Sequence, residues 1–78
     1  MQYSEDVWEA ILDSISEAGL VSVLNNLREI ERHDGINIGL ALDWASYYNV
    51  HLSKEIEETV RERVAGGDLE PEALEAFE

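Results

Sequence analysis

The two histidines carry the most versatile chemistry in this chain, and their spacing does not favour a metal site. Glu29 lies one helical turn before His33 and Asp34 follows it, whereas His51 stands alone further along the chain. Zinc and calcium sites are usually recognised by motifs such as His-x-x-x-His or an Asp-rich loop, and neither motif occurs here. The helix dipole favours a histidine in the last turn of a helix, which accounts for His33. We therefore expect no metal ion and no other cofactor.

Nucleophilic and acid–base catalysis have equally little support. The chain has no cysteine, and none of its serines lies in a Gly-x-Ser-x-Gly turn. Gly35 and Gly39 are not followed by the Gly-Lys-Ser/Thr of a phosphate-binding loop. Glu57 and Glu58 are adjacent, so on a helix they diverge and would not share a proton. A chain of 78 residues also has little room to enclose a substrate, and we predict that the protein is not an enzyme.

Charge is the strongest global signal. Eighteen acidic residues face five basic ones, which gives a net charge of −13 at pH 7. Such a charge repels nucleic-acid phosphates and anionic membranes, so we expect direct binding to neither. It suits a protein partner with a basic surface. Solubility, or adaptation to a salty cytoplasm, would explain the same excess of acid, and both explanations stay open.

The length predicts a single helical domain over 1–78, with the main core at 1–65 and a Gly-Gly joint and tail at 66–78. Hydrophobic residues make up 45% of the chain and recur periodically, which favours a folded protein over a disordered one. No apolar run approaches the ~18 residues of a membrane-spanning helix, and the N-terminus has no basic region ahead of an apolar one. We therefore expect a soluble, cytoplasmic protein.

Two helices are predicted in the first half of the chain, over Glu5–Ala18 and from Leu20 to a stop at Gly35. Ser4 is a suitable N-cap for the first helix, and Tyr3 and Trp8 are placed to form a hydrophobic staple. Each helix has an apolar stripe at helical spacing. The stripes consist of Val7, Trp8, Ile11, Leu12 and Ile15, and of Leu20, Val23, Leu24, Leu27 and Ile30.

The stretch Ile36–Leu52 has the densest apolar content, and we predict that it forms a central helix against which the other segments pack. Its apolar residues fall in two rows that leave only a narrow polar or small strip, which is typical of a helix buried on several sides. The rows are Ile36, Leu40, Trp44 and Tyr47, and Ile38, Leu42, Ala45 and Tyr48. Asn37 or Asp34 would cap the beginning of this helix.

The end of the central stretch allows more than one structure. We expect a break between Asn49 and Ser53, because the intervening residues have modest helix propensity and Ser53 is a natural new N-cap. A single helix that continues to Val64 is one alternative. A strand over Tyr47–Leu52 is another, because side chains there alternate in the manner of a strand.

The last third of the chain predicts a thin helix and a short tail. The helix Lys54–Ala65 has apolar residues only in one row and should pack by one edge. That row is Ile56, Val60 and Val64. Pro71 suits the first position of a short C-terminal helix, from which Leu74 and Phe77 would dock on the core. The predicted fold class is therefore all-α, a compact array of about four helices with a short C-terminal helical tail.

Three surfaces are candidates for binding a partner. Two are acidic helix faces, with carboxylates at Glu5, Asp6, Glu9, Asp13 and Glu17, and at Glu55, Glu57, Glu58 and Glu62. The third is aromatic and comprises Trp44, Tyr47 and Tyr48, residue types that often dominate binding energy. Core packing is the simpler explanation for these aromatics. If part of the central stretch is left uncovered, it would suit a homodimer.

The segment from Asn49 to Gly67 resembles the strand and first helix of a ribbon-helix-helix antitoxin. It has alternating residues, then the cap Ser53, a Glu-apolar pair, an amphipathic helix and a small-Gly stop. The resemblance implies a dimer in which Asn49 and His51 point from the ribbon toward DNA. It covers about nineteen residues of the chain, and its ribbon carries no basic side chain.

The leading hypothesis is a small acidic, non-enzymatic protein that binds another protein as a regulator or inhibitor. In its sharper form, helix-borne carboxylates imitate phosphates and occupy a basic site on a nucleic-acid-binding protein. Some anti-CRISPR and anti-restriction proteins act in this way, and the analogy is one of composition. The alternatives are a DNA-binding regulator of the ribbon-helix-helix antitoxin kind, and a helical assembly subunit whose aromatic face is its interface.

Overall fold

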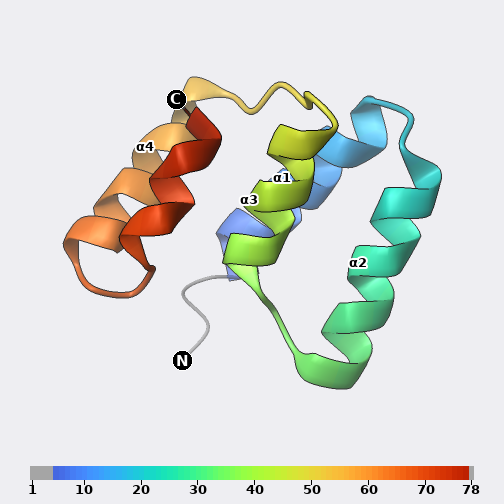
Figure 1. The fold of residues 1–78 in the computed structure, drawn as a ribbon, viewed down its shortest axis with the longest axis horizontal. Coiled ribbons are helices and arrows are strands. Elements are labelled where there is room, and N and C mark those ends of the chain that lie inside the picture. Colours follow the sequence, from blue (N-terminus) through green and yellow to red (C-terminus); the bar gives the residue numbers. More distant parts are fainter. Residues whose placement is uncertain (1–4, 78) are drawn as a thin grey trace.

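A computed structural model describes residues 5–77 of the 78-residue chain, and this part of the chain is helical without strands. Four α-helices, α1 to α4, are followed by a 3₁₀ helix, η1 (Figure 1). Their bounds are α1 Glu5–Glu17, α2 Val21–Asp34, α3 Ile38–Tyr47, α4 Lys54–Ala65 and η1 Pro71–Phe77. The all-α class, with about four helices and a short C-terminal piece, is confirmed. None of the described helices has the length and apolar character needed to cross a membrane.

Helix α1 provides the largest share of the core. All five residues of its predicted stripe are buried, and it packs against α2, α3 and α4. Glu5 and Asp6 lie in its first turn, where the helix dipole favours acidic side chains. The proposed cap Ser4 and staple residue Tyr3 lie outside the described residues. The helix ends at Glu17, one residue earlier than predicted, and Gly19 follows in the left-handed region at φ +80°.

Helix α2 lies at the side of the molecule and packs chiefly against α1. Val23 and Leu27 are its buried residues, and no side chain caps its beginning at Val21. In Figure 1, α2 stands on one side of the α1–α3 pair, and α4 with η1 stands on the other. Arg28 joins α2 to α1, because its Nη1 and Nη2 donate to the two carboxylate oxygens of Glu9 at 2.8 and 3.0 Å.

Helix α3 is shorter than the predicted central helix. It begins at Ile38, where the Oδ1 of Asn37 accepts a hydrogen bond from the Leu40 N–H at 3.1 Å. Asn37, rather than Asp34, is therefore the cap. The buried face of α3 packs against α1 and η1. Its buried residues are Ile38, Ala41, Leu42 and Ala45.

Asn49 fixes the end of α3. Its φ is +59°, a left-handed conformation that asparagine tolerates better than most residues. The Asn49 N–H donates to the carbonyl of Ser46 at 3.1 Å, and the Val50 N–H donates to the carbonyl of Ala45 at 2.8 Å. These two bonds form the Schellman motif that ends many helices. The last helical residue is therefore Tyr47.

The expected break after Asn49 is confirmed, and both alternatives are wrong. Residues 50–53 have no regular structure, so neither a strand over Tyr47–Leu52 nor a helix that runs on to Val64 is formed. Within the central stretch Ile36–Leu52, the helix covers only Ile38–Tyr47, so it begins later than predicted and ends just before the expected break. A capping asparagine and a left-handed asparagine override the apolar content of the flanking residues.

Helix α4 has the predicted bounds. The Oγ of Ser53 accepts a hydrogen bond from the Ile56 N–H at 3.2 Å, which confirms its role as N-cap. Ile56 and Val60 are buried. The chain then turns through Gly67 at φ +84° and forms η1 along α3 and α4.

The tail docks as expected, although its helix is of the 3₁₀ type. Leu74 and Phe77 are partly buried against the core, and Ala73 is buried. Seven residues are too few for an isolated α-helix, so packing determines the form of the tail.

The described core is apolar throughout. No polar or charged residue between 5 and 77 is buried. The described core does contain one polar side-chain atom without a hydrogen-bond partner, the indole nitrogen of Trp8. Trp8 is 0% exposed, and its Nε1 finds no acceptor among the described residues. The large hydrophobic residues that remain exposed include Tyr47 and Tyr48 at the end of α3.

Candidate functional site

The acidic face of α4 is built from three of its four predicted carboxylates. Glu55, Glu58 and Glu62 are exposed and follow one another at spacings of three and four residues, which places them along one side of a helix. Glu57 is partly buried and accepts hydrogen bonds from Nη2 and Nε of Arg61 at 2.7 and 3.0 Å. The structure therefore brings three of the carboxylates together and pairs the fourth with a cation.

The predicted aromatic surface also contains both exposed and partly buried residues. Trp44 is partly buried against the core, whereas Tyr47 is 78% exposed and Tyr48 is 46% exposed. The two tyrosine rings meet edge to face, with centroids 4.9 Å apart and planes at 84°. Both rings lie at the C-terminal end of α3, and neither is among the residues that pack against the core. They form an exposed aromatic pair.

All four arginines are engaged in ion pairs within the chain. Arg28 pairs with Glu9 and also with Glu31, and Arg63 reaches across to Asp6 of α1 at 3.2 Å. The other two pairs are Arg32 with Glu29 and Arg61 with Glu57. The positive charge of the arginines is therefore matched locally, and exposed Lys54 is the basic residue that forms no ion pair within residues 5–77. The excess carboxylates determine the field that a partner meets.

These pairs also shift the ionisation of their members. The hydrogen bond from Arg28 holds the pKa of Glu9 below its ordinary value, although partial burial opposes the shift. Hydrogen bonds from Arg32 and His33 lower the pKa of Glu29 in the same direction. The pKa of Arg28 is raised, chiefly by its hydrogen bond to Glu9. These carboxylates therefore stay charged to lower pH than free side chains would.

A groove opens where α3 begins, with a volume of about 1370 Å³. The end of α2, the beginning of α3 and the turn between α4 and η1 all lie at this end of the molecule (Figure 1). Seven carboxylates line it, and no basic side chain is among its lining residues. They are Glu5, Glu31, Asp34, Asp43, Asp68, Glu70 and Glu72. Only Glu31 of these seven forms an ion pair within residues 5–77.

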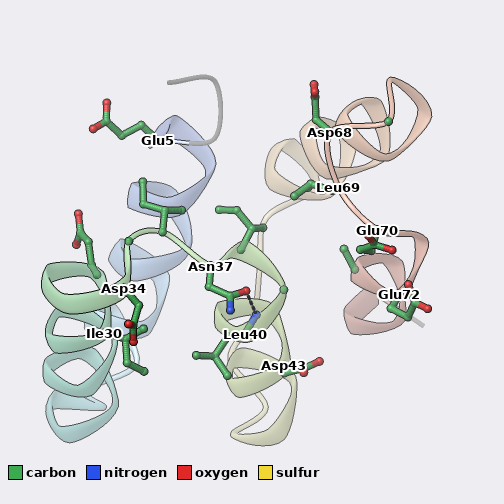
Figure 2. A pocket seen from close by; sticks show the side chains of 17 residues that line it. Glu5, Ile30, Asp34, Asn37, Leu40, Asp43, Asp68, Leu69, Glu70 and Glu72 are labelled. Atoms are coloured by element: carbon green, nitrogen blue, oxygen red, sulfur yellow. Dashed lines mark hydrogen bonds between the residues drawn. The ribbon is translucent and has the colours of Figure 1, made fainter. Parts of the chain in front are cut away.

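The floor of the groove is apolar. Ile36, Leu40 and Leu69 line it and are partly buried, and Ile38 and Ala73 line it and are buried. Figure 2 shows carboxylates on both sides of Asn37 and Leu40, which lie between them. An apolar floor between acidic walls can accept a protein segment that presents apolar side chains flanked by cations.

The groove carboxylates are spread around its walls and do not converge on one point. Between residues 5 and 77, no group of three or more His, Asp or Glu side chains is arranged to hold a metal ion. The groove has no signature in the sequence, because its acids come from segments far apart in the chain. They come to one place when α2 and α3 pack on α1 and η1 packs on α3 and α4.

The resemblance to a ribbon-helix-helix antitoxin loses its structural basis. The ribbon that it implies would include Asn49 and His51, and residues 49–52 contain no strand. The helix that follows is present, with its cap at Ser53, but such a capped helix occurs in many folds. No family model, curated protein or solved structure matches the chain.

Proposed function

We propose that this protein is a non-enzymatic regulator or inhibitor that binds another protein and occupies a basic site on it. The observation that supports this most directly is the pairing of all four arginines with carboxylates of the same chain. The outward charge is then almost entirely negative, and the net charge is −13. Such a field attracts basic surfaces and speeds their encounter with the protein.

A nucleic-acid-binding protein is the partner class that fits this field best, because its basic site is built to receive a row of negative charges. On α4, Glu55, Glu58 and Glu62 would be separated by about 4.5 and about 6 Å along the helix axis. Duplex DNA carries one charge per about 1.7 Å and a single strand one per about 3.4 Å. The row is therefore sparser than either, and we propose competition for the basic site rather than a close copy of a duplex.

The exposed tyrosines would add anchoring contacts to this attraction. Tyr47 and Tyr48 offer aromatic area with few rotatable bonds, a property common to residues at the centres of interfaces. Charge would then bring the partner in, and aromatic contact would slow its release.

The test begins with capture of the partner from the native host by the immobilised protein, followed by identification by mass spectrometry. The purified partner is then titrated with the protein and with the double variant Glu58→Lys/Glu62→Lys. We expect the variant to bind at least about tenfold more weakly, with affinities that fall as salt rises. A labelled nucleic acid bound to the partner should be displaced by the unmodified protein.

A matched control carries the same change of charge elsewhere. Asp13 and Glu17 are exposed on α1, and Asp13→Lys/Glu17→Lys alters the net charge by the same amount. Circular dichroism establishes that both variants keep their helices. Equal binding by the α4 variant and the unmodified protein would contradict the proposal. Equal weakening by both variants would show attraction to total charge without a role for the α4 row.

A second function is favoured by the exposure of Tyr47, which at 78% is unusual for a large side chain. The pair Tyr47–Tyr48 would then be the interface of a helical assembly subunit, including a homodimer. Sedimentation at micromolar concentration distinguishes the two functions. A dimer that becomes monomeric in Tyr47→Ser/Tyr48→Ser supports the assembly role, and a monomer in both proteins removes it.

A further inference from the structure

We propose that the groove at the beginning of α3 is the docking site for a cationic amphipathic helix of the partner protein. This proposal rests on the function proposed above and specifies the element that the partner presents. The groove is distinct from the α4 row, because none of Glu55, Glu58 and Glu62 lines it. The two surfaces can therefore be altered separately.

The groove exists because α2 is packed on one side only. Helix α2 packs chiefly on α1, while α3 packs on α1 and η1, so the seam between the end of α2 and η1 is left unfilled. Gly35, which follows α2, and Gly67, in the turn between α4 and η1, line this seam, and both have a positive φ. The opening is thus set by the arrangement of the helices rather than by the position of one side chain.

Charge complementarity identifies the occupant as cationic. Six carboxylates without an ion-pair partner in the described chain face the seam, and the lining residues include no lysine, arginine or histidine. They come from both of its sides, with Glu5 and Asp34 on one side and Asp68, Glu70 and Glu72 on the other (Figure 2). Lysine or arginine side chains on two flanks of one element would meet carboxylates on both walls.

Because the floor of the groove is apolar, we infer that the same occupant also has an apolar face. Ile36, Leu40 and Leu69 remain partly exposed to the groove and would be covered by an apolar side chain placed between the walls. A purely polar basic segment would leave these three residues exposed. The volume of about 1370 Å³ exceeds the about 300–1,000 Å³ of common small-molecule pockets, which favours a protein element over a metabolite.

A helix fits this pattern better than an extended strand. Residues 5–77 form no strand, so the groove offers no sheet edge along which a peptide backbone could add hydrogen bonds. An amphipathic helix presents apolar side chains every three or four residues and cations on either side of that stripe. The order across such a helix is basic, apolar, basic, which matches acidic, apolar, acidic across the groove.

Gly39 provides a way to block the groove without disturbing the core. It lies in the first turn of α3, is exposed, and lines the groove. A Cβ atom at this position would meet only the Oδ1 of Asn37, at an ordinary contact distance of 3.7 Å. A side chain placed there extends into open space, and most residues favour helices more than glycine does.

The experiment uses two labelled peptides of about 14 residues, or about four helical turns. One has leucines at helical spacing and lysines elsewhere. The other has the same composition in an order that gives no apolar face. Binding to the full chain is followed by fluorescence anisotropy at about 0.15 M salt, where non-specific attraction is partly screened. The amphipathic peptide is expected to bind one-to-one and at least about tenfold more tightly than the permuted one, a difference of about 1.4 kcal/mol.

Two matched pairs of variants locate the site. Gly39→Arg places a cation in the groove, and Gly39→Glu places a side chain of similar bulk and opposite charge there. Asp34→Asn/Asp43→Asn/Glu72→Gln removes three groove charges, and Glu55→Gln/Glu58→Gln/Glu62→Gln removes three from α4. We expect Gly39→Arg and the groove triple variant to bind the amphipathic peptide at least about tenfold more weakly, and the α4 variant to change its affinity less than about threefold. Circular dichroism and thermal unfolding verify that each variant is folded.

The outcomes separate this proposal from the function on which it rests. Equal affinity for the two peptides, or an equal loss in the groove and α4 triple variants, would overturn the groove as a docking site and leave general attraction to basic partners intact. Binding that is unchanged by both substitutions at Gly39 would overturn it as well. A loss with both Gly39 variants supports occupancy of the groove, because bulk alone then blocks it. If neither peptide binds the unmodified chain, the groove is overturned as a docking site, whereas the proposed function is still judged by the binding of the captured partner to the α4 variant.

Discussion

Helices α1 and α3 each carry one tryptophan and lie against each other, yet their roles in the fold differ. Trp8 of α1 is 0% exposed, and its helix packs against three others. Trp44 of α3 is only partly buried, and its helix contacts α1 and η1. Five large side chains are buried on α1, whereas two of the four buried residues of α3 are alanines. The core is therefore centred on α1, although α3 is the more apolar of the two segments.

The difference shows that the arrangement of apolar residues matters more than their number. The apolar residues of α1 lie in one stripe, so a single face carries all of them into the core. Those of α3 extend around the helix, and one helix in a small domain cannot be covered on every side. The surplus appears at its two ends, as Leu40 beside the groove and Tyr47 at the surface.

The largest effect that tests this comparison is expected from the two tryptophans. Trp8→Ala should cost about 3–5 kcal/mol, because it removes the largest fully buried side chain. That is close to the total stability of ~5 kcal/mol typical of a small domain, so the variant should be largely unfolded. Trp44→Ala should cost about 1–2 kcal/mol, because less of its surface is covered. The free energy of unfolding of both variants is measured by urea denaturation, with circular dichroism as the signal.

Trp8→Phe is the control for the indole group. It keeps an aromatic ring and removes an N–H that lacks an acceptor among the described residues, so it should cost less than half as much as Trp8→Ala. Equal losses in Trp8→Ala and Trp44→Ala would show that the two helices contribute equally to the core, contrary to their burial.

A smaller effect is expected from the residues that set the beginnings of α3 and α4. Asn37→Ala and Ser53→Ala each remove a side-chain acceptor for an N–H of the first turn, and each should cost about 1 kcal/mol. Asn37→Asp and Ser53→Asp are controls that retain an acceptor and should be close to neutral. If Asn37→Ala has no effect, the beginning of α3 is determined by packing instead. Thermal unfolding is sensitive to differences of this size.

The pair Glu9–Arg28 predicts a pH-dependent contribution to the packing of α2 on α1. The fold lowers the pKa of Glu9 from its ordinary value of 4.5, so the pair contributes fully above that pH and is lost as pH falls through the lower folded value. Both side chains are nearly half exposed, at 44% and 47%, which limits the contribution to below about 1 kcal/mol. Glu9→Gln should therefore lower stability at pH 7 and have less effect near pH 2. A difference between the proteins that grows on acidification would contradict this assignment.

The smallest effect on stability is expected at the exposed end of α3. Tyr47→Ser should change the free energy of unfolding by less than about 0.5 kcal/mol, because Tyr47 is 78% exposed. The matched substitution Leu42→Ser, in the same helix at 1% exposure, should unfold the protein. Chemical denaturation of the two variants distinguishes the covered and uncovered parts of α3. A large loss in Tyr47→Ser would show that this ring is covered in solution, as an interface between copies would require.

Most of the secondary structure could be predicted because it depends on nearby residues. The capping side chain of Ser53 and the Gly-Gly pair after Ala65 predict the limits of α4, Lys54 and Ala65. The early end of α3 was harder to predict, because it depends on Asn49 in a left-handed conformation that the sequence only permits. The central position given to Ile36–Leu52 followed from counting apolar residues, whereas burial depends on which of them face other helices.

The candidate surfaces also differ in whether the sequence could predict them. The carboxylate row on α4 could be predicted, because helical spacing alone places Glu55, Glu58 and Glu62 on one side. The pairing of Glu57 with Arg61 also follows from a spacing of four residues. The groove could not be predicted, because it is formed by residues from α1 to η1 that come together only when the helices pack. Its acids have no shared spacing in the sequence.

The unbonded indole nitrogen of Trp8 makes this side chain a natural reporter of how the protein opens. A proton on Nε1 that lacks an acceptor is protected from exchange with water only by the core around it, since no local hydrogen bond has to break. Because Trp8 is 0% exposed and touches the centre of the fold, water reaches it only when the helices separate. The exchange rate of this one proton should therefore follow the global opening equilibrium, while that of Trp44 should report motions of the surface alone.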